Sequence, residues 1–524
     1  MLSKENIRNL LELRFEKDIH KKLSEIPKPS ALKDIYKGAN RIKEAIKNNE
    51  HIGIVGDYDV DGVVSSAIMA EFFDDIGVKN YQVRIPNRFK DGYGLNPEII
   101  DELGNISLII TVDNGISAHE AAQICAERGI DLIITDHHMP PPELPKAYAI
   151  INPKQDDCEF PNIEICGAQV AWYVVGALKE VLGIEYDMAN FLDLLAIAII
   201  ADMMELRDMN RILVRLGISR INSSKRVAFR AIKEYYGKDK FECDDISFLI
   251  APLINSAGRM DDAINSFNFL HTKNLKEAND YLDMIVDFNN SRKEEERALF
   301  ESSLKDVEND ENIIVTWGEN WHEGVIGIVA SRLAKHFKKP AIVFSIDKGR
   351  AKGSARSVGK LDILSLIAQH SSLLSSYGGH KGAAGLVCEP ENLQKFKEAI
   401  NGSCFLMDMH KFCRSDELLG NISANEIDFE LLEILEFFEP YGQKNPRPIF
   451  QLSQATVKNE RVIGKEQNHL KLVLEKDGKT LEALFFNFTR HVRVGENIDI
   501  TFSISKNSFR GLVTPQLLIR ELVE

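Results

Sequence analysis

Three short segments of the chain carry closely spaced acidic residues and histidines that could bind metal ions. Carboxylate and imidazole groups suit Mn²⁺ or Mg²⁺, whereas a zinc site built on thiolates would need cysteines, which these segments lack. So many carboxylates cannot be buried in one place without cations to balance them. The segments are GDYDVDG with Asp57, Asp59 and Asp61, TVDNG with Asp113, and TDHH with Asp136, His137 and His138.

Each of these segments comes directly after a short apolar run: IGIV, LIITV and LIIT. Stretches with helical periodicity lie between them, at 63–76 and 117–129. Apolar strands that alternate with helices are typical of a parallel, doubly wound sheet. In such a sheet the ligand site lies at the carboxyl ends of the strands, so all three segments are expected to line one pocket.

A fourth contributor to the pocket is Asp202, which follows the apolar run LLAIAIIA at 194–201. An aspartate after an apolar helix is more often a cap or a surface residue, and a lone aspartate at a strand end is an equally weak signal. Structural packing, however, gives no reason for acids and histidines to recur at three strand ends. The group as a whole therefore indicates a metal site.

The rest of the chain changes pattern several times. Residues 274–308 form one long amphipathic stretch without a sustained heptad repeat, which predicts a helical connector. From about 450, short alternating strands with a DG turn predict a small β-barrel of the OB type. The expected divisions are a helical segment at 1–50, a catalytic α/β domain at 51–210, a helical region with the connector at 211–308, a second α/β domain at 309–405 and a β-domain at 420–524.

The composition is that of a globular protein, with 44% hydrophobic and 27% charged residues. No apolar run approaches the ~20 residues that cross a bilayer, and the N-terminus lacks the apolar core of a signal peptide, so a cytoplasmic location is expected. The net charge of −15 does not exclude a nucleic-acid substrate, because local basic surfaces bind it. Lysine and arginine are concentrated at 207–238 and 335–360.

The triplet Asp136-His137-His138 resembles the one that names the DHH phosphoesterase family. The resemblance implies two divalent cations, Mn²⁺ or Mg²⁺, in one active site, where they activate a water and stabilise the leaving oxygen. It also implies catalytic roles for Asp136 and His138, with His138 contacting the scissile phosphate or assisting proton transfer. The implied metal set, with Asp113 as a bridge and Asp57 in a supporting position, is Asp57, Asp59, Asp61, Asp113, His137 and Asp202.

Three later segments, WHEGVIGIVASRL, KGSARS and YGGHKGAAG, resemble the DHH-associated C-terminal domain of the same family. Their glycines allow close approach of the backbone to a phosphate chain. Three further segments are similar to the branch of the family that digests single-stranded DNA from its 5′ end: IPNRFKDGYGL at 85–95, LINSAGRM at 253–260 and EPYGQKNPRPIF at 439–450. Ala355 is a mild departure, since that branch more often has glycine there.

The resemblance implies a metal-dependent exonuclease that hydrolyses single-stranded DNA 5′→3′ to mononucleotides, in DNA repair and recombination. The expected architecture is α/β: a doubly wound parallel-sheet DHH domain and a second α/β DHH-associated domain joined by a long helix, plus a C-terminal OB-like β-barrel. The groups expected to bind the DNA phosphates, above all the 5′-phosphate, are Arg88, Arg259, Ser354, Arg356 and His380.

The barrel is expected to extend the path of the strand through basic groups and base stacking, although Phe485, Phe486, Phe488 and Phe502 lie at positions that are more often core. The expected partners of a monomeric chain are single-stranded DNA, a helicase and a single-strand-binding protein, with no membrane. Two alternatives stay open. A DHH phosphatase acting on short oligonucleotides or nucleotide phosphates needs neither connector nor barrel, and a catalytically inactive replication scaffold would have broken metal motifs.

Overall fold

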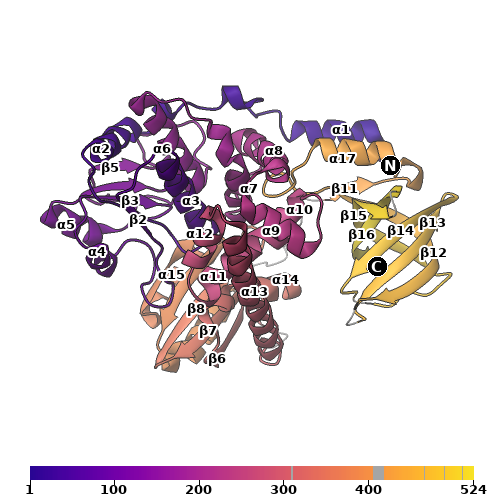
Figure 1. The fold of residues 1–524 in the computed structure, drawn as a ribbon. Coiled ribbons are helices and arrows are strands. Elements are labelled where there is room, and N and C mark those ends of the chain that lie inside the picture. Colours follow the sequence, from indigo (N-terminus) through magenta and orange to yellow (C-terminus); the bar gives the residue numbers. More distant parts are fainter. Residues whose placement is uncertain (308–310, 405–417, 465–466, 489, 510–511, 524) are drawn as a thin grey trace.

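The computed structural model of the chain is built on three β-sheets (Figure 1). It describes residues 1–307, 311–404, 418–464, 467–488, 490–509 and 512–523. In the view of Figure 1, the first sheet with its helices lies on the left, the C-terminal barrel lies on the right, and the second α/β domain lies below the helices between them. Within the described residues, no helix is both long and apolar enough to cross a membrane.

The first sheet is parallel throughout, with strand order β2-β1-β3-β4-β5. Its inner strands are continuous apolar runs because helices cover both faces: α2, α3 and α6 pack on one, α4 and α5 on the other. The strands are β1 (Ile52–Val55), β2 (Tyr81–Arg84), β3 (Leu108–Val112), β4 (Asp131–Thr135) and β5 (Ala149–Ile151), and the helices are α2 (Ile35–Lys47), α3 (Val60–Asp75), α4 (Pro97–Leu103), α5 (His119–Arg128) and α6 (Gly167–Leu182).

A helical region continues the core of the first domain. The run LLAIAIIA forms α7, which is buried because it has no polar face. The connector is a single helix of 29 residues, α13, as predicted, and it packs against α9, α11 and α14. The helices are α7 (Leu192–Ala201), α8 (Asp208–Ser223), α9 (Val227–Tyr236), α10 (Cys243–Asp245), α11 (Ala251–Met260), α12 (Ile264–His271) and α13 (Leu275–Ser303), with a π-helical turn at Ile246–Ile250.

The second α/β domain has a mixed sheet of order β6-β7-β8-β10-β9, in which only β6 and β7 are parallel. Alternate residues of β8 are buried, so its other residues share one accessible face. The elements are β6 (Ile314–Glu319), α14 (Glu323–Phe337), β7 (Ala341–Asp347), β8 (Arg350–Arg356), α15 (Ile363–Ala368), β9 (Ser376–His380), β10 (Ala383–Cys388) and α16 (Leu393–Cys404).

The C-terminal domain is a closed barrel of five strands, β12, β13, β14, β16 and β15, which the pairing of β15 with β12 completes. Its predicted DG turn joins β13 to β14: Asp477 and Gly478 both have positive φ (54° and 75°), as a type I′ hairpin turn requires. The elements are β11 (Leu418–Asn421), α17 (Phe429–Phe437), β12 (Ile449–Ile463), β13 (His469–Lys476), β14 (Lys479–Phe486), β15 (Asn497–Phe509) and β16 (Leu512–Val523).

The N-terminal helix α1 (Lys4–Leu13) belongs to the core of this C-terminal domain (Figure 1). Ile7 and Leu11 are buried in the apolar cluster of the barrel and α17. Lys4 adds ion pairs to Asp428 at 2.5 Å and Glu430 at 2.7 Å. Because α2 instead packs on the first sheet, the helices of residues 1–50 serve two different cores.

The docking of α1 predicts different costs for two leucines on the same helix. Leu11 is fully buried, so Leu11→Ala should destabilise the C-terminal domain by about 2–5 kcal/mol. Leu13 is 62% exposed, so Leu13→Ala should change stability by less than about 0.5 kcal/mol. Urea unfolding measures the loss and amide hydrogen exchange assigns it to a domain. Equal effects of the two substitutions would show that α1 does not dock there.

Candidate metal centre

The predicted acids gather where the strand order of the first sheet reverses, between β1 and β3. Asp57 is the second residue after β1, Asp113 directly follows β3, and Asp136 directly follows β4. Their side chains are almost fully buried. Asp113 also has a positive φ of 63°, a conformation that a non-glycine residue adopts only where the surrounding structure holds it. The carboxyl ends of three neighbouring strands thus line one pocket, as expected for a doubly wound sheet.

Two helix N-termini point into the same pocket. Asp59 caps α3 and accepts a hydrogen bond from the backbone N–H of Asp61 at 2.9 Å. Asp61 accepts from the backbone N–H groups of Gly167 (2.6 Å) and Ala168 (2.9 Å) at the start of α6. A Cβ at Gly167 would lie 2.5 Å from the Asp113 side chain, so only glycine lets α6 approach this closely. Because helix N-termini favour negative charge, the backbone offsets part of the repulsion among the carboxylates.

Asp136 holds the neighbouring histidine in place. Its Oδ1 atom lies 2.7 Å from Nδ1 of His138 and accepts from the backbone N–H of His137 at 2.7 Å. Its Oδ2 atom accepts from the backbone N–H of Ile116 at 2.9 Å. With both oxygens engaged, Asp136 orients the His138 ring and leaves the Nε2 atom of that ring for other partners.

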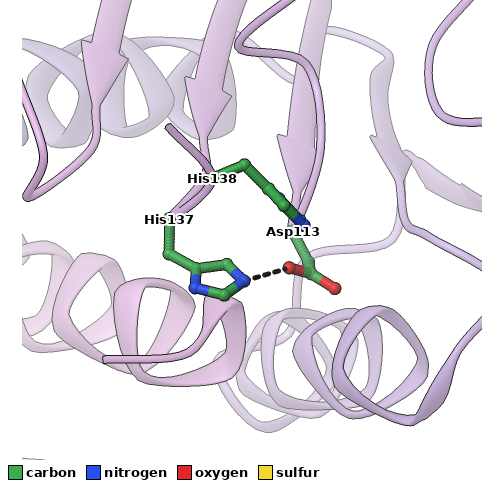
Figure 2. A group of neighbouring side chains, drawn as sticks. All are labelled: Asp113, His137 and His138. Carbon is green, nitrogen blue, oxygen red and sulfur yellow. Dashed lines mark ion pairs between the residues drawn. The ribbon is translucent and has the colours of Figure 1, made fainter. Parts of the chain in front are cut away.

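His137 lies at the centre of the pocket. Its Nε2 atom is 3.2 Å from an Asp113 oxygen (Figure 2), 3.6 Å from Asp202 and 3.7 Å from Asp61. Asp202 reaches this point from the end of α7. Side chains from β3, β4, α3 and α7 therefore meet around one imidazole nitrogen.

Three overlapping groups of side chains have ligand atoms within 4.8 Å of one another, close enough to share a cation. Asp113 and His137 each belong to two of the groups. Among the described residues, Oδ1 of Asp113 and Oδ2 of Asp202 are buried without a hydrogen-bond partner, which is costly for a charged oxygen. A cation would supply the missing partner. The groups are Asp57 with Asp59 and Asp113, Asp61 with His137 and Asp202, and Asp113 with His137 and His138.

The pKa values of the carboxylates are shifted in the direction that a cation would reverse. Burial raises the pKa of Asp113 well above its usual value, and the negative charge of Asp61 raises it further. Burial and the charge of Asp59 raise the pKa of Asp61 to about 6. Burial and the charge of Asp61 also raise the pKa of Asp202. A nearby cation favours the ionised form, so metal binding should release protons from this pocket.

The pKa values of His137 and His138 are shifted in opposite directions. Burial lowers the pKa of His137 to about 3, and the positive charge of His138 acts in the same sense. A neutral His137 is the form that binds metals. Burial also works against the charged form of His138, but the hydrogen bond with Asp136 outweighs it and raises the pKa of His138 to about 9. The His138 side chain is 47% exposed, so its charge is accessible to a substrate.

The predicted phosphate-binding arginines come from the first α/β domain, the helical region and the second α/β domain. Arg88 lies in the loop after β2, Arg259 in the last turn of α11, and Arg356 at the end of β8, where it donates to Oγ of Ser354 at 3.0 Å. Burial and the positive charge of Arg88 lower the pKa of Arg259 to about 10 and also lower that of Arg356. No ion pair to any of these arginines is present in the described part of the chain. We call Arg88, Arg259, Arg356 and Ser354 the arginine cluster.

His380, at the end of β9, lies within electrostatic reach of both sites. Burial lowers its pKa, and the charges of Arg356 and His138 lower it further. Its Nδ1 atom accepts from the backbone N–H of Gly382 at 3.1 Å. The exposed ring is therefore near both Arg356 of the arginine cluster and His138 of the metal pocket.

Two residues of the pocket were outside the sequence prediction. The hydroxyl of Tyr93 donates to the backbone oxygen of Asp113 at 3.4 Å, and its ring meets His138 edge-on with 6.2 Å between centroids. Lys154 follows β5, and its charge acts on His137. The strand-end rule that identified the acids would also have identified Lys154, and Tyr93 lies in the segment IPNRFKDGYGL, of which only Arg88 was predicted to be a site residue.

Three family descriptions match successive parts of the chain. Residues 51–199 match the DHH family, N-terminal domain, residues 310–404 match the DHHA1 domain, and residues 420–521 match the RecJ OB domain. These matches confirm the resemblance inferred from the Asp-His-His triplet and the expected succession of domains.

The whole chain is similar to proteins named single-stranded-DNA-specific exonuclease RecJ. The protein from Haemophilus influenzae is 32% identical, and 96% of this chain and 93% of that protein are covered. The protein from Bacillus subtilis is 33% identical, with 96% of this chain and 65% of that longer protein covered. The crystal structure of RecJ in complex with Mn²⁺ from Thermus thermophilus has a TM-score of 0.84 at 26% identity, covering 99% of this chain and 76% of that one.

The similarity extends through nearly the full length of the Haemophilus relative and spans the three matched parts of this chain. The solved structure adds that the domains are also arranged alike. The chain belongs to the RecJ family of DHH proteins.

Proposed function

We propose that the protein hydrolyses single-stranded DNA from the 5′ end and releases mononucleotides, with Mn²⁺ or Mg²⁺ as cofactor, in DNA repair and recombination. The observation that carries the proposal is the set of three overlapping ligand groups around His137 and Asp113. The relatives support it, since they are named single-stranded-DNA-specific exonucleases and one solved structure holds Mn²⁺.

Two divalent cations fit the ligands present. Asp113 would contribute to more than one cation site, because it belongs to two of the ligand groups and its carboxylate has two oxygens. When bound, such a pair activates a water and stabilises the leaving oxygen. The residues that would hold the cations are Asp57, Asp59, Asp61, Asp113, His137 and Asp202.

His138 acts directly on the substrate. Its raised pKa of about 9 keeps the ring protonated near neutral pH, and Asp136 fixes the ring through Nδ1. An imidazolium beside the scissile phosphate attracts the anion and can pass a proton from Nε2 to the leaving oxygen. Asp136 thereby sets both the orientation and the charge of His138.

The arginine cluster binds the 5′-terminal phosphate. That phosphate is a dianion near neutral pH, and a planar guanidinium can donate to two of its oxygens at once. Arginines that lower one another's pKa gain from a bound anion. Anchoring the 5′ phosphate at the cluster and cutting at the metals gives the 5′→3′ polarity, and His380, which is near both sites, adds to phosphate binding.

The alternatives fit these observations less well. A phosphatase for short oligonucleotides has no use for the 29-residue connector and the barrel. An inactive scaffold would have lost ligands, whereas every acid expected from the family pattern is present and lies at the pocket. We further propose a cytoplasmic, monomeric enzyme that works with a helicase and a single-strand-binding protein, since an enzyme for single strands needs separated strands.

Asp113→Asn should abolish hydrolysis without unfolding the chain. In the folded, metal-free protein the pKa of Asp113 lies above its unfolded value of about 4. Ionised Asp113 therefore destabilises the fold increasingly as the pH rises through and above that value, and is harmless below it. Metal-free Asp113→Asn should be at least as stable as the wild type at pH 7, and its advantage should grow as the pH rises above about 4. Thermal unfolding and calorimetric Mn²⁺ titration measure both effects.

Asp283→Asn is the matched control for this substitution, because Asp283 lies exposed on α13. It should leave Mn²⁺ binding, hydrolysis and the pH profile of stability unchanged. Wild-type hydrolysis rates in Asp113→Asn, or in the wild type with excess chelator, would refute the metal mechanism.

Arg356→Ala should remove the preference for 5′-phosphorylated over 5′-hydroxyl strands. Loss of the charge-assisted hydrogen bonds should weaken binding of the phosphorylated strand by about 1.5–3 kcal/mol, roughly ten- to a hundredfold. Initial rates on both strands give the ratio. Arg230→Ala, at an exposed ion pair on α9, is the control. If Arg356→Ala keeps the wild-type ratio, Arg356 does not bind the 5′ end.

The barrel should contribute base stacking through Phe486, whose ring is half exposed. The other three phenylalanines named in the sequence analysis are less accessible: Phe485 and Phe502 are buried in the core, and Phe488 packs against it. Phe486→Ala should weaken the binding of long single strands by about 1–3 kcal/mol and leave the hydrolysis of very short ones unchanged. Phe429→Ala on α17 removes an equally exposed ring from the same domain and should have no effect. Fluorescence anisotropy with long and short strands measures the affinities of both variants. If Phe486→Ala and Phe429→Ala bind long strands equally well, the DNA does not stack on Phe486.

A further inference from the structure

The arginine cluster and the metal ligands are joined through Tyr58. This residue stands between Asp57 and Asp59 in GDYDVDG. The guanidinium of Arg88 lies 4.5 Å from the centroid of the Tyr58 ring, where the ring face attracts a cation. Tyr93 supports the same ring edge-on, with 6.0 Å between centroids. A displacement of Tyr58 would therefore move a metal-binding loop and a phosphate-binding arginine together.

A backbone contact joins Tyr58 to a second arginine of the cluster. Gly258, the residue before Arg259 on α11, packs directly against the Tyr58 carbonyl group. A Cβ at Gly258 would lie 2.1 Å from the Tyr58 oxygen, far inside contact distance. Because the opposing atom belongs to the backbone, it cannot rotate away as a side chain could.

A third contact seats the second α/β domain on α11. A Cβ at Gly324, in the first turn of α14, would lie 2.0 Å from the backbone oxygen of Arg259. In return, Nη1 of Arg259 donates to the backbone oxygen of Gly324 at 3.1 Å. Arg259 thus holds residue 324 with both its backbone and its side chain.

The helix that begins at this contact also reaches the last members of the cluster. One turn beyond Gly324, a Cβ at Gly327 would lie 3.0 Å from Nη2 of Arg356 and 3.0 Å from Oγ of Ser354. A continuous series of close contacts therefore runs from the metal-binding loop through α11 and α14 to the end of β8. Close-packed contacts of this kind are hardly compressible, so a displacement of one element moves the elements packed against it.

We propose that Tyr58, Gly258 and Gly324 form a spacer that sets the distance between the metal centre and the arginine cluster, and with it the number of nucleotides released at each cut. This inference rests on the proposed function, because it takes the cluster as the binding site of the 5′-phosphate. The strand is cut at the metals and held at the cluster, so their separation fixes the length of the product. The three residues are positioning residues and need not touch the DNA.

Gly324→Ala is the principal test, because its methyl group pushes α14 away from Arg259 without touching the metal-binding loop. We expect kcat/KM on 5′-phosphorylated single strands to fall roughly 10- to 100-fold, as a misplacement of about 1 Å can cause. Dinucleotides should appear among the first products, which mass spectrometry of an early digest identifies. Hydrolysis of bis(p-nitrophenyl) phosphate, a small diester without a 5′ end, should fall far less.

Gly402→Ala is the matched control, since nothing lies within 4 Å of a Cβ at that position on α16 of the same domain. It should keep the wild-type rate and products. Tyr58→Leu removes the support of Arg88 without introducing a clash, and serves if Gly324→Ala does not fold; it too should release dinucleotides. Tyr58→Phe keeps the ring beside Arg88 and should therefore release mononucleotides, as the wild type does.

The spacer is refuted if Gly324→Ala and Tyr58→Leu release only mononucleotides, or if they lower strand and small-diester hydrolysis in parallel. It is also refuted if Gly402→Ala alters the products in the same way as Gly324→Ala. Failure of the proposed function is a separate result, because the wild type itself would then release no mononucleotides from the 5′ end of a single strand in Mn²⁺.

Discussion

Electrostatic repulsion among buried carboxylates is the constraint on which the rest of the structure depends. Asp57, Asp61 and Asp113 are almost fully buried at the ends of strands and helices that meet at one point. The N-terminus of α6 offsets part of their charge through hydrogen bonds to Asp61, and His137 stays neutral because burial lowers its pKa to about 3. The remaining charge requires cations. The fold therefore requires bound cations to balance its buried charge, and the proposed hydrolysis uses the same cations.

The same constraint explains why the arginines come from elsewhere. An arginine among the carboxylates would form ion pairs with them. These pairs would occupy the metal ligands, and the guanidinium would no longer be free to bind the 5′ phosphate of the proposed substrate. Instead, the uncharged Tyr58 ring and backbone contacts lie between Arg88 or Arg259 and the metal pocket. Arg356 arrives on a different domain. Two sites of opposite charge can thus lie close together without neutralising each other.

Much of this arrangement could be predicted from the sequence, because strand ends and turn chemistry are local. The apolar runs before Asp57, Asp113 and Asp136 indicate where the strands end. Because the strands are parallel, their carboxyl ends lie at one edge of the sheet, which brings the three aspartates together. The individual roles of the site residues and the domain limits remain predictions. The docking of α1 on α17 could not be predicted, because an amphipathic helix does not indicate which core will cover it. Nor could the role of Gly258 and Gly324, since a close contact depends on a partner distant in the sequence.

The barrel domain contacts the catalytic part of the molecule in more than one place. Arg211 on α8 donates to the backbone oxygen of Phe437 at 3.0 Å and lies 4.3 Å from the centroid of the Phe15 ring. The backbone N–H of Leu206 donates to the oxygen of Gln443 at 2.8 Å. A further contact, the ion pair between Lys338 directly after α14 and Glu521 on β16 at 2.9 Å, joins the barrel to the second α/β domain. The barrel is therefore tied both to the helical region and to the domain that carries Arg356. In the proposed function the barrel grips the strand and the arginine cluster holds its 5′ end, and this ion pair directly joins the domains that carry the two tasks.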